Sequence, residues 1–218
     1  MIIKPQVCII GLGKFGYTLG TNLLEQGHKV VGIDSNSELV ARAQKLFTQV
    51  FEADSTQKQA LEQIGVSDMT HVLVSVGDSI SASAMITMYL KELGIPNVWA
   101  KAVNEDHAKL LTKIGADQVI IPEHIAAKRL ADQITIPGII QRLSFDSDMI
   151  IRELEIEKFK GKTIREIDLT NRFDVQIIAI KKKGSHTYRY IPRANDQLSE
   201  GDIVIVIGAV NSLSQIKP

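Results

Sequence analysis

Cysteine is nearly missing from this chain, in which Cys8 is the single cysteine among 218 residues. One cysteine excludes a disulfide framework within the chain and favours a cytosolic location. Cys8 lies inside an apolar run, where a thiol is expected to behave as a small core residue.

An excess of either charge is also missing, because 25 Lys and Arg balance 25 Asp and Glu. The balance removes the electrostatic basis for direct binding to nucleic acid or to an anionic membrane surface. No apolar run approaches the roughly 20 residues that a membrane-spanning helix needs, and the N-terminus has no signal-peptide pattern. The composition, 44% hydrophobic and 23% charged, is that of a soluble globular protein, so any membrane role is expected to go through a partner.

Catalytic signatures are missing as well: the sequence has no GxSxG, HExxH, Walker A or CxxC motif. The five histidines form no recognisable catalytic constellation. His28 and His71 begin predicted strands, His107 and His124 are expected to cap helices or to face solvent, and His186 lies in a predicted hairpin turn. These absences favour a protein that binds its ligand without transforming it.

The most informative stretch that is present is GxGxxG, at Gly11, Gly13 and Gly16. An apolar β-branched run over 7–10 predicts a buried parallel strand before it, and a helical pattern follows it. Gly11 is expected to form the tight turn, Gly13 to let backbone approach a phosphate, and Gly16 to let the helix pack on the strand. A second strand over 29–33 ends at Asp34, about the spacing at which a carboxylate reaches a ribose. This context predicts a nucleotide site.

The same alternation of strand and helix continues along the chain. Further strands are predicted over 50–52, 71–76, 98–102 and 118–121, and further helices over 37–45, 54–64, 79–93 and 106–114. Six strands and five helices of these lengths predict an α/β fold with a doubly wound, six-stranded parallel sheet of the Rossmann type. Gly11–Gly16, Asp34, Asp54 and Gly77 should then converge in one crevice. Asp54 is either an ordinary helix cap or a residue that faces adenosine.

The alternation of strand and helix ends after another amphipathic helix over 123–134 and a break at Pro137-Gly138. Short strands and turns then predict a small α+β lobe of about 70 residues, near the lower limit for an independent core. We therefore expect a nucleotide-binding domain over 1–143, which includes this amphipathic helix, and a C-terminal lobe over 144–218.

The sequence resembles the RCK (regulator of potassium conductance) proteins of the KtrA/TrkA type over essentially its whole length. The resemblance rests on GLGKFG at 11–16, DSN at 34–36, DST at 54–56, LKELGIPNVWAK at 90–101, KIGAD at 113–117, IPE ending at Glu123, and GKTIREIDL from Gly161.

The family is one of cytosolic gating subunits of bacterial potassium transporters, so the resemblance implies a function, an assembly and a location. The chain would not be an enzyme. It would form dimers that assemble into an octameric ring on the inner face of the cell membrane, under a KtrB/TrkH-like potassium-translocating subunit. A small-molecule ligand at the C-terminal lobe is a further expectation.

The resemblance also implies ligands and the residues that contact them. ATP and ADP would be the ligands, with NAD or NADH as the alternative, and Mg²⁺ or another cation near the phosphates would be held by Glu123. The implied nucleotide contacts are Gly11, Gly13, Lys14, Phe15, Gly16, Asp34, Ser35, Asn36, Asp54, Ser55, Thr56, Gly77 and Lys101.

The chain departs from the family at Lys14, where many members carry arginine. That arginine is implied to reach the terminal phosphate bound by the neighbouring subunit. Lysine is a compact point charge without the bidentate fork, and its alternative role is that of a solvated residue in the first helical turn. For Glu123, the alternative is an acid favoured by the helix dipole alone.

Two other classes remain open at the level of sequence. One is a module that senses NAD(H) and regulates transcription or acts as a scaffold, and the other is a nicotinamide-dependent oxidoreductase. A DNA-binding module would need a basic helix-turn-helix, which the neutral charge balance does not supply. An oxidoreductase would change the absorbance of its nicotinamide with some substrate.

Overall fold

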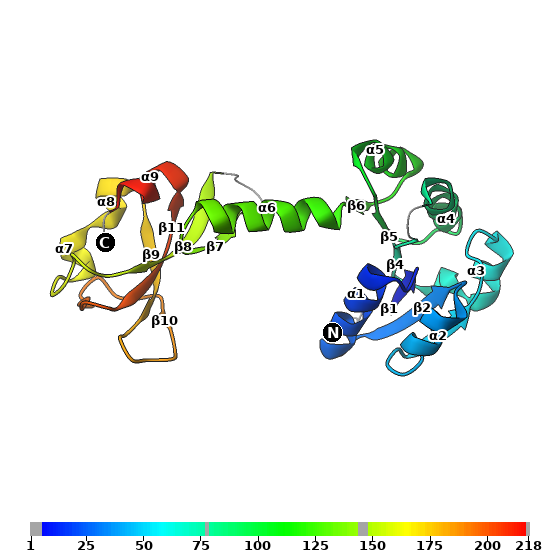
Figure 1. The fold of residues 1–218 in the computed structure, drawn as a ribbon, viewed down its shortest axis with the longest axis horizontal. Helices are drawn as coiled ribbons and strands as arrows, with labels where there is room; N and C mark the ends of the chain where they lie inside the picture. Colours follow the sequence, from blue (N-terminus) through cyan, green and yellow to red (C-terminus); the bar gives the residue numbers. More distant parts are fainter. Residues whose placement is uncertain (1–5, 77–78, 144–147, 217–218) are drawn as a thin grey trace. The chain divides into compact units, whose positions relative to one another are not determined.

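The computed structural model describes residues 6–76, 79–143 and 148–216. Its contacts divide the chain into two compact units, Met1–His124 and Ile125–Pro218 (Figure 1). The first unit holds a six-stranded parallel sheet in the order β3-β2-β1-β4-β5-β6. Its strands are β1 (Gln6–Ile10), β2 (Lys29–Asp34), β3 (Gln49–Glu52), β4 (His71–Val74), β5 (Asn97–Lys101) and β6 (Gln118–Ile120). The predicted doubly wound sheet is confirmed.

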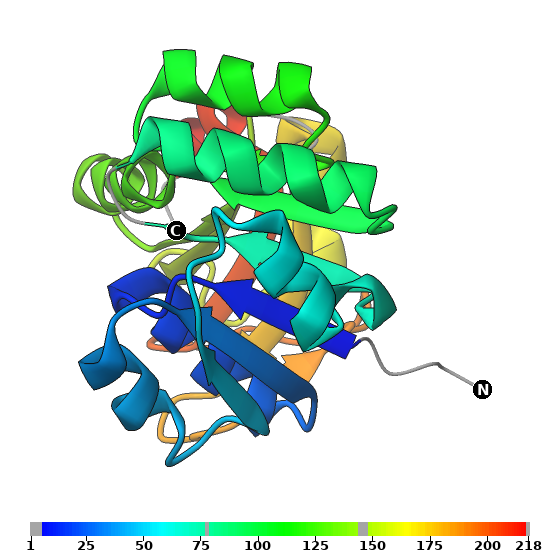
Figure 2. The same cartoon turned by 90° about the vertical axis from the view of Figure 1, so that its right-hand side faces the viewer.

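Helices cover both faces of this sheet. They are α1 (Lys14–Glu25), α2 (Ser37–Ala43), α3 (Lys58–Ile64), α4 (Ile80–Glu92) and α5 (Glu105–Ile114), with the 3₁₀ turn η1 (Val66–Asp68). Apolar residues of α1 and α2 pack on one face, whereas Leu61, Ile86 and Leu111 bring α3, α4 and α5 onto the other. Figure 2 shows α4 and α5 side by side. This division follows from the right-handed crossovers between parallel strands.

The strands are buried on both faces, which explains their continuous apolar sequences. In β1, Val7 and Ile9 belong to the cluster with α1 and α2, while Cys8 and Ile10 belong to the opposite cluster. Cys8 is fully buried, and this burial raises the pKa of its thiol to about 12. The thiol is therefore a core group, as expected.

The second unit holds an antiparallel sheet in the order β10-β9-β11-β8-β7. Its elements are β7 (Ile139–Arg142), β8 (Met149–Glu155), α7 (Ile164–Ile167), α8 (Leu169–Phe173), β9 (Gln176–Lys181), β10 (Arg189–Tyr190), β11 (Ile203–Ala209) and α9 (Val210–Gln215). Burial alternates along β11, because one face packs on the apolar cluster of this unit. The small α+β lobe is confirmed.

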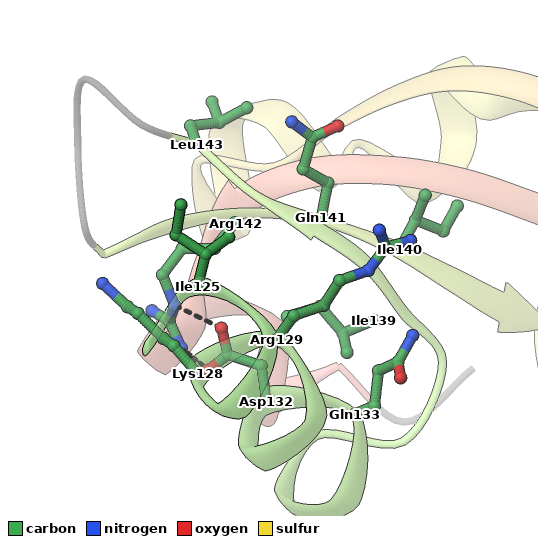
Figure 3. A pocket seen from close by; sticks show the side chains of 10 residues that line it. All are labelled: Ile125, Lys128, Arg129, Asp132, Gln133, Ile139, Ile140, Gln141, Arg142 and Leu143. Atoms are coloured by element: carbon green, nitrogen blue, oxygen red, sulfur yellow. Dashed lines mark hydrogen bonds and ion pairs between the residues drawn. The ribbon is translucent and has the colours of Figure 1, made fainter. Parts of the chain in front are cut away.

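The helix α6 (Pro122–Thr135) begins in the first unit and extends into the second. The contacts divide the chain between His124 and Ile125, earlier than the predicted boundary at 143. The strand β7 accounts for part of the difference, since it pairs with β8 at the edge of the second sheet. Arg142 of β7 also donates two hydrogen bonds to Asp132 of α6, at 2.6 and 3.0 Å (Figure 3).

Local details of two helices differ from the prediction. The helix α2 ends at Ala43 instead of 45, and Asn36 caps it, because the Asn36 side chain accepts hydrogen bonds from two backbone N–H groups. The helix expected from Asp54 begins at Lys58. In the second unit, Asp168 has a φ of +51°, which ends α7 and separates it from α8. An Asx residue can satisfy either a helix end or a turn, so sequence alone does not place these boundaries.

Candidate nucleotide-binding site

The carboxyl ends of β1, β2 and β4 meet at a cavity of about 350 Å³, a volume within the range of small-molecule sites. The cavity is lined by Ile10, Gly11, Gly13, Ile33, Asp34, Ser35, Leu39, Ala53, Asp54, Ser55, Thr56, Ser75, Val76, Ser79, Ala82 and Ile86. Gly11, Gly13, Asp34 and Asp54 thus converge as the crossover argument predicts. Gly77, the fourth predicted segment of this crevice, falls outside the described residues.

Each glycine of the loop is required for a different physical reason. Gly11 has φ +94°, and a Cβ there would lie 2.3 Å from the carbonyl oxygen of Ser75. A Cβ at Gly16 would lie 2.0 Å from the carbonyl oxygen of Gly11, so only glycine lets α1 pack this closely. At Gly13, in contrast, no described atom lies within 4 Å of an added Cβ. Gly13 therefore borders open space, which is where a phosphate needs close access to backbone.

The first turn of α1 is suited to an anion. Gly13 is its N-cap, and in the described part of the chain no side chain satisfies the N–H groups of that turn. The turn also contains no acidic residue that would repel a phosphate. The N–H groups and the positive end of the helix dipole both favour negative charge there.

Asp34 is held in place by backbone. Its Oδ2 accepts a hydrogen bond from Leu12 N (2.6 Å), and its Oδ1 accepts one from Asn36 N (2.8 Å). The carboxylate therefore links the glycine loop to the end of β2 and stays half-exposed at the cavity. Ser35 lines the cavity beside it, whereas the side-chain oxygen of Asn36 is used to cap α2.

Asp54 forms a turn instead of a helix cap. Its Oδ1 accepts hydrogen bonds from Thr56 Oγ1 (2.7 Å) and Thr56 N (2.9 Å), and these bonds hold the pKa of the Asp54 carboxyl below its usual range. The carboxylate is therefore charged at neutral pH. Asp54, Ser55 and Thr56 all line the cavity, so the turn forms part of its wall.

Five other predicted residues lie apart from the lining, and Gly16, packed against the Gly11 backbone, is one of them. Lys14 is exposed on α1, and Phe15 packs against the apolar cluster between the sheet and the helices α1 and α2. Lys101, at the end of β5, forms an ion pair with Glu123 at 3.6 Å. Among the described residues no three His, Cys, Asp or Glu side chains are grouped to hold a metal ion. A cation at Glu123 stays a prediction.

The α4 wall of the cavity was missed at the sequence level. Ser79, Ala82 and Ile86 line the site from α4, and Ser79 also caps this helix by accepting a hydrogen bond from Ala82 N (3.2 Å). A usable signal was present, because Ser79 follows the carboxyl end of β4 and so had to lie at the same edge of the sheet as Gly11.

His107 differs from its expected solvated role, because 2% of the residue is exposed. Its Nδ1 accepts a hydrogen bond from Val103 N (3.3 Å), and its Nε2 lies 2.7 Å from Ser83 Oγ on α4. A neutral ring that carries its proton on Nε2 satisfies both contacts. Burial lowers the pKa of His107 from its ordinary value, so the ring stays neutral. The residue lies four positions before the buried Leu111 on the same face of α5, which explains its burial.

Stability that depends on His107 should decrease in acid. Because the pKa of His107 is lower in the folded state than in the unfolded state, its contribution is present above about pH 6.5 and is lost as pH falls toward the folded-state pKa. At pH 7.5, His107→Gln should cost about 1–3 kcal/mol by disturbing two buried hydrogen bonds. The difference from wild type should shrink at pH 5.

Trp99 is the single tryptophan and lies in the first unit, so its fluorescence during urea unfolding measures this effect. The exposed His186 of the second unit supplies the control substitution His186→Gln. A gap between wild type and His107→Gln that is constant from pH 7.5 to 5 would contradict the neutral buried ring.

The fold and the cavity together define a class. A doubly wound parallel sheet with GxGxxG between its first strand and first helix, and an acid at the end of the second strand, is a Rossmann-type domain of the nucleotide-binding class. The second unit is an additional α+β lobe. In the described residues, no helix combines the length and the apolar character needed to cross a membrane.

Comparison with known proteins gives the family. Residues 7–122 match the TrkA-N domain and residues 150–218 match the TrkA-C domain. The chain is 32% identical to Ktr system potassium uptake protein C of Bacillus subtilis (strain 168), over 99% of this chain and 97% of that protein. It is also 32% identical to Ktr system potassium uptake protein A of the same organism, over 95% and 93%. The chain therefore belongs to the KtrA/TrkA family of RCK-domain proteins, as its motifs predicted.

Solved structures support the fold. The GsuK channel bound to NAD matches with a TM-score of 0.63 and 22% identity, over 96% of this chain and 38% of that one. The GsuK structure bound to ADP matches with a TM-score of 0.52 and 22% identity, over 60% and 34%. The chain thus corresponds to less than half of the GsuK protein. The match to the NAD-bound structure covers both units of this chain.

Proposed function

We propose that this chain is a cytosolic regulatory subunit of a potassium uptake system, which binds a nucleotide and changes the activity of a membrane potassium-translocating subunit. The observation that carries the proposal is the nearly full-length match, at 32% identity, to two Ktr system potassium uptake proteins. The cavity at the glycine loop supplies the place where a ligand acts. The chain itself would catalyse no reaction.

The proposed ligand is an adenine nucleotide, ATP or ADP, with NAD or NADH as the alternative. Gly13 leaves room for a phosphate at the N-terminus of α1, and the half-exposed Asp34 carboxylate offers an acceptor for ribose hydroxyls. Lys14 would approach a terminal phosphate from a neighbouring subunit, and Glu123 would hold Mg²⁺ or another cation. The matching GsuK structures are bound to NAD and to ADP.

The proposed assembly is a homodimer that uses α6, repeated into an octameric ring. None of the 14 residues of α6 is buried in this chain, and Ile125, Leu130 and Ile134 are 60%, 58% and 81% exposed. Apolar exposure of this extent along one helix favours a protein partner, and a second copy of α6 is the occupant we propose. Ile125 of α6, Arg142 and Leu143 are among the residues that line a hollow of about 470 Å³. Figure 3 shows how these side chains lie around it.

The two proposed domains, 1–143 and 144–218, would divide the work between nucleotide binding and regulation. A second small-molecule ligand would bind the C-terminal lobe, where a hollow of about 370 Å³ lies between α7, α8 and β9. A regulatory subunit acts on its partner only if its ligand binds two shapes with different affinity. A difference of about 1.4 kcal/mol shifts such an equilibrium tenfold.

Potassium uptake by a bacterial strain that lacks its own uptake systems tests this function. The chain is expressed with the membrane subunit of its own system, and uptake is compared with cells that carry the membrane subunit alone. We expect the chain to raise uptake several-fold and Gly13→Ala to remove most of this gain. Equal uptake with and without the chain would refute the proposal, and a substrate-dependent change in nicotinamide absorbance would replace it with an oxidoreductase.

A further inference from the structure

Arg42 of α2 contacts the back of the glycine loop. Its Nη2 donates a hydrogen bond to the carbonyl oxygen of Leu12 at 3.0 Å, and its guanidinium carbon lies 3.9 Å from the centre of the Tyr17 ring. Tyr17 is itself stacked on Phe47, with ring centroids 5.8 Å apart and planes 18° apart. The guanidinium is therefore held both by a hydrogen bond and by an aromatic face.

This contact fixes the direction of a neighbouring donor. A trans peptide is planar, so its N–H points opposite to its C=O. When Arg42 holds the Leu12 carbonyl on its own side, the N–H of Gly13 points the other way. Gly13 lines the cavity, and a Cβ added there meets open space. Arg42 thus fixes the direction of a potential phosphate donor that belongs to a residue lining the cavity.

The peptide between Gly11 and Leu12 is also held by a charged side chain, that of Asp34. Leu12 N donates to Asp34 Oδ2 at 2.6 Å, so the peptide groups on both sides of Leu12 are bound by a charged side chain. Arg42 is not among the residues that line the cavity in the described structure. It therefore reaches the ligand site through Leu12 instead of touching the ligand.

We propose that Arg42 is a positioning residue that orients the Gly13 N–H for the phosphates of a nucleotide. The inference rests on the proposed nucleotide site and adds the residue that pre-organises its phosphate loop. Pre-organisation matters because a loop that must be ordered on binding lowers the affinity. The consequence is specific, since the phosphate part of the ligand depends on Arg42 and the nucleoside part does not.

The test compares ADP with adenosine by calorimetry, using displacement for the weaker ligand. Arg42→Ala should weaken ADP binding about tenfold, the cost of a misdirected hydrogen bond to a charged group, and leave adenosine within twofold. Arg42→Lys keeps the charge and loses the planar stack, so its ADP affinity should lie between those of wild type and Arg42→Ala. The exposed Lys45, just after α2, gives the matched control Lys45→Ala, which removes the same charge without touching Leu12.

Each outcome is decisive. Unchanged ADP affinity in Arg42→Ala overturns the positioning role, and so does an equal loss for ADP and adenosine, which would indicate a general effect on the fold. If Trp99 fluorescence shows that Arg42→Ala is unfolded, Arg42→Lys carries the same comparison. Failure of the wild-type chain to bind any nucleotide is a separate result and refutes the nucleotide site itself.

Discussion

Replacing Gly13 with alanine is expected to weaken phosphate binding in the cavity strongly and to leave the fold intact. The backbone of Gly13, with φ −61° and ψ −168°, is accessible to alanine, and an added Cβ meets no described atom within 4 Å. The free energy of unfolding should therefore change by less than about 1 kcal/mol. The same Cβ would occupy the space in which a phosphate approaches, so ADP affinity should fall about tenfold to a hundredfold.

Gly16→Ala is the matched comparison, because it adds the same methyl group one helical turn away. Its Cβ would lie 2.0 Å from the carbonyl oxygen of Gly11, and backbone atoms must move to relieve the clash. We expect a loss of about 3 kcal/mol in the free energy of unfolding, the upper end of overpacking costs. Trp99 fluorescence in urea and calorimetry with ADP separate the two effects. Equal destabilisation by both substitutions would contradict the distinct roles of the two glycines.

The parts of the fold that the sequence predicts are those with local signals. The apolar run before Gly11 is buried on both faces of the sheet, which is the environment that a central parallel strand gives to consecutive residues. The αL glycines Gly65 and Gly115 end α3 and α5 where a left-handed residue is needed. Because these signals lie within each element, the number and order of the strands follow from the sequence.

The parts of the site that were not predicted depend on contacts between distant residues. Arg42 reaches Leu12 across 30 positions, and Ser83 reaches His107 across 24, so no local pattern marks either pair. Asn36 was hard to assign for a different reason: its side-chain amide can contact a ligand or cap a helix, and in the structure it caps α2. In such cases competition between two uses is decided by tertiary structure.

Asp202→Ala is expected to destabilise the second unit by about 3 kcal/mol. The residue is 1% exposed, and its carboxylate accepts hydrogen bonds from Lys182 Nζ (2.6 Å), Lys183 N (3.0 Å) and Ser199 N (2.8 Å). Alanine would leave the N–H groups of Lys183 and Ser199 without this acceptor, and a buried donor without a partner costs about 1–3 kcal/mol. Lys182 Nζ is half-exposed and also donates to Gln197 O (2.7 Å), so its loss contributes less. The three bonds also join the hairpin after β9 to the turn before β11.

The measurement is amide hydrogen exchange in β8, β9 and β11, with Trp99 fluorescence as the internal reference for the first unit. Glu200→Ala is the control, because Glu200 pairs with Lys160 at the surface and such pairs contribute little. Protection in β9 and β11 should decrease in Asp202→Ala and stay unchanged in the control. Unchanged protection in Asp202→Ala would show that the turn is held by other contacts.

The pH dependence of the same variant adds an independent check. Burial alone would raise the pKa of Asp202, but the bond from Lys182 and the two backbone N–H groups outweigh it and hold the pKa below its usual range. Because the pKa is lowered on folding, the stabilisation is present above about pH 4 and is lost as pH falls through the folded-state pKa. Wild-type protection in β9 and β11 should therefore fall more steeply between pH 5 and pH 3 than that of Asp202→Ala. A parallel decrease in both proteins would mean that the carboxylate is not the group that couples this turn to pH.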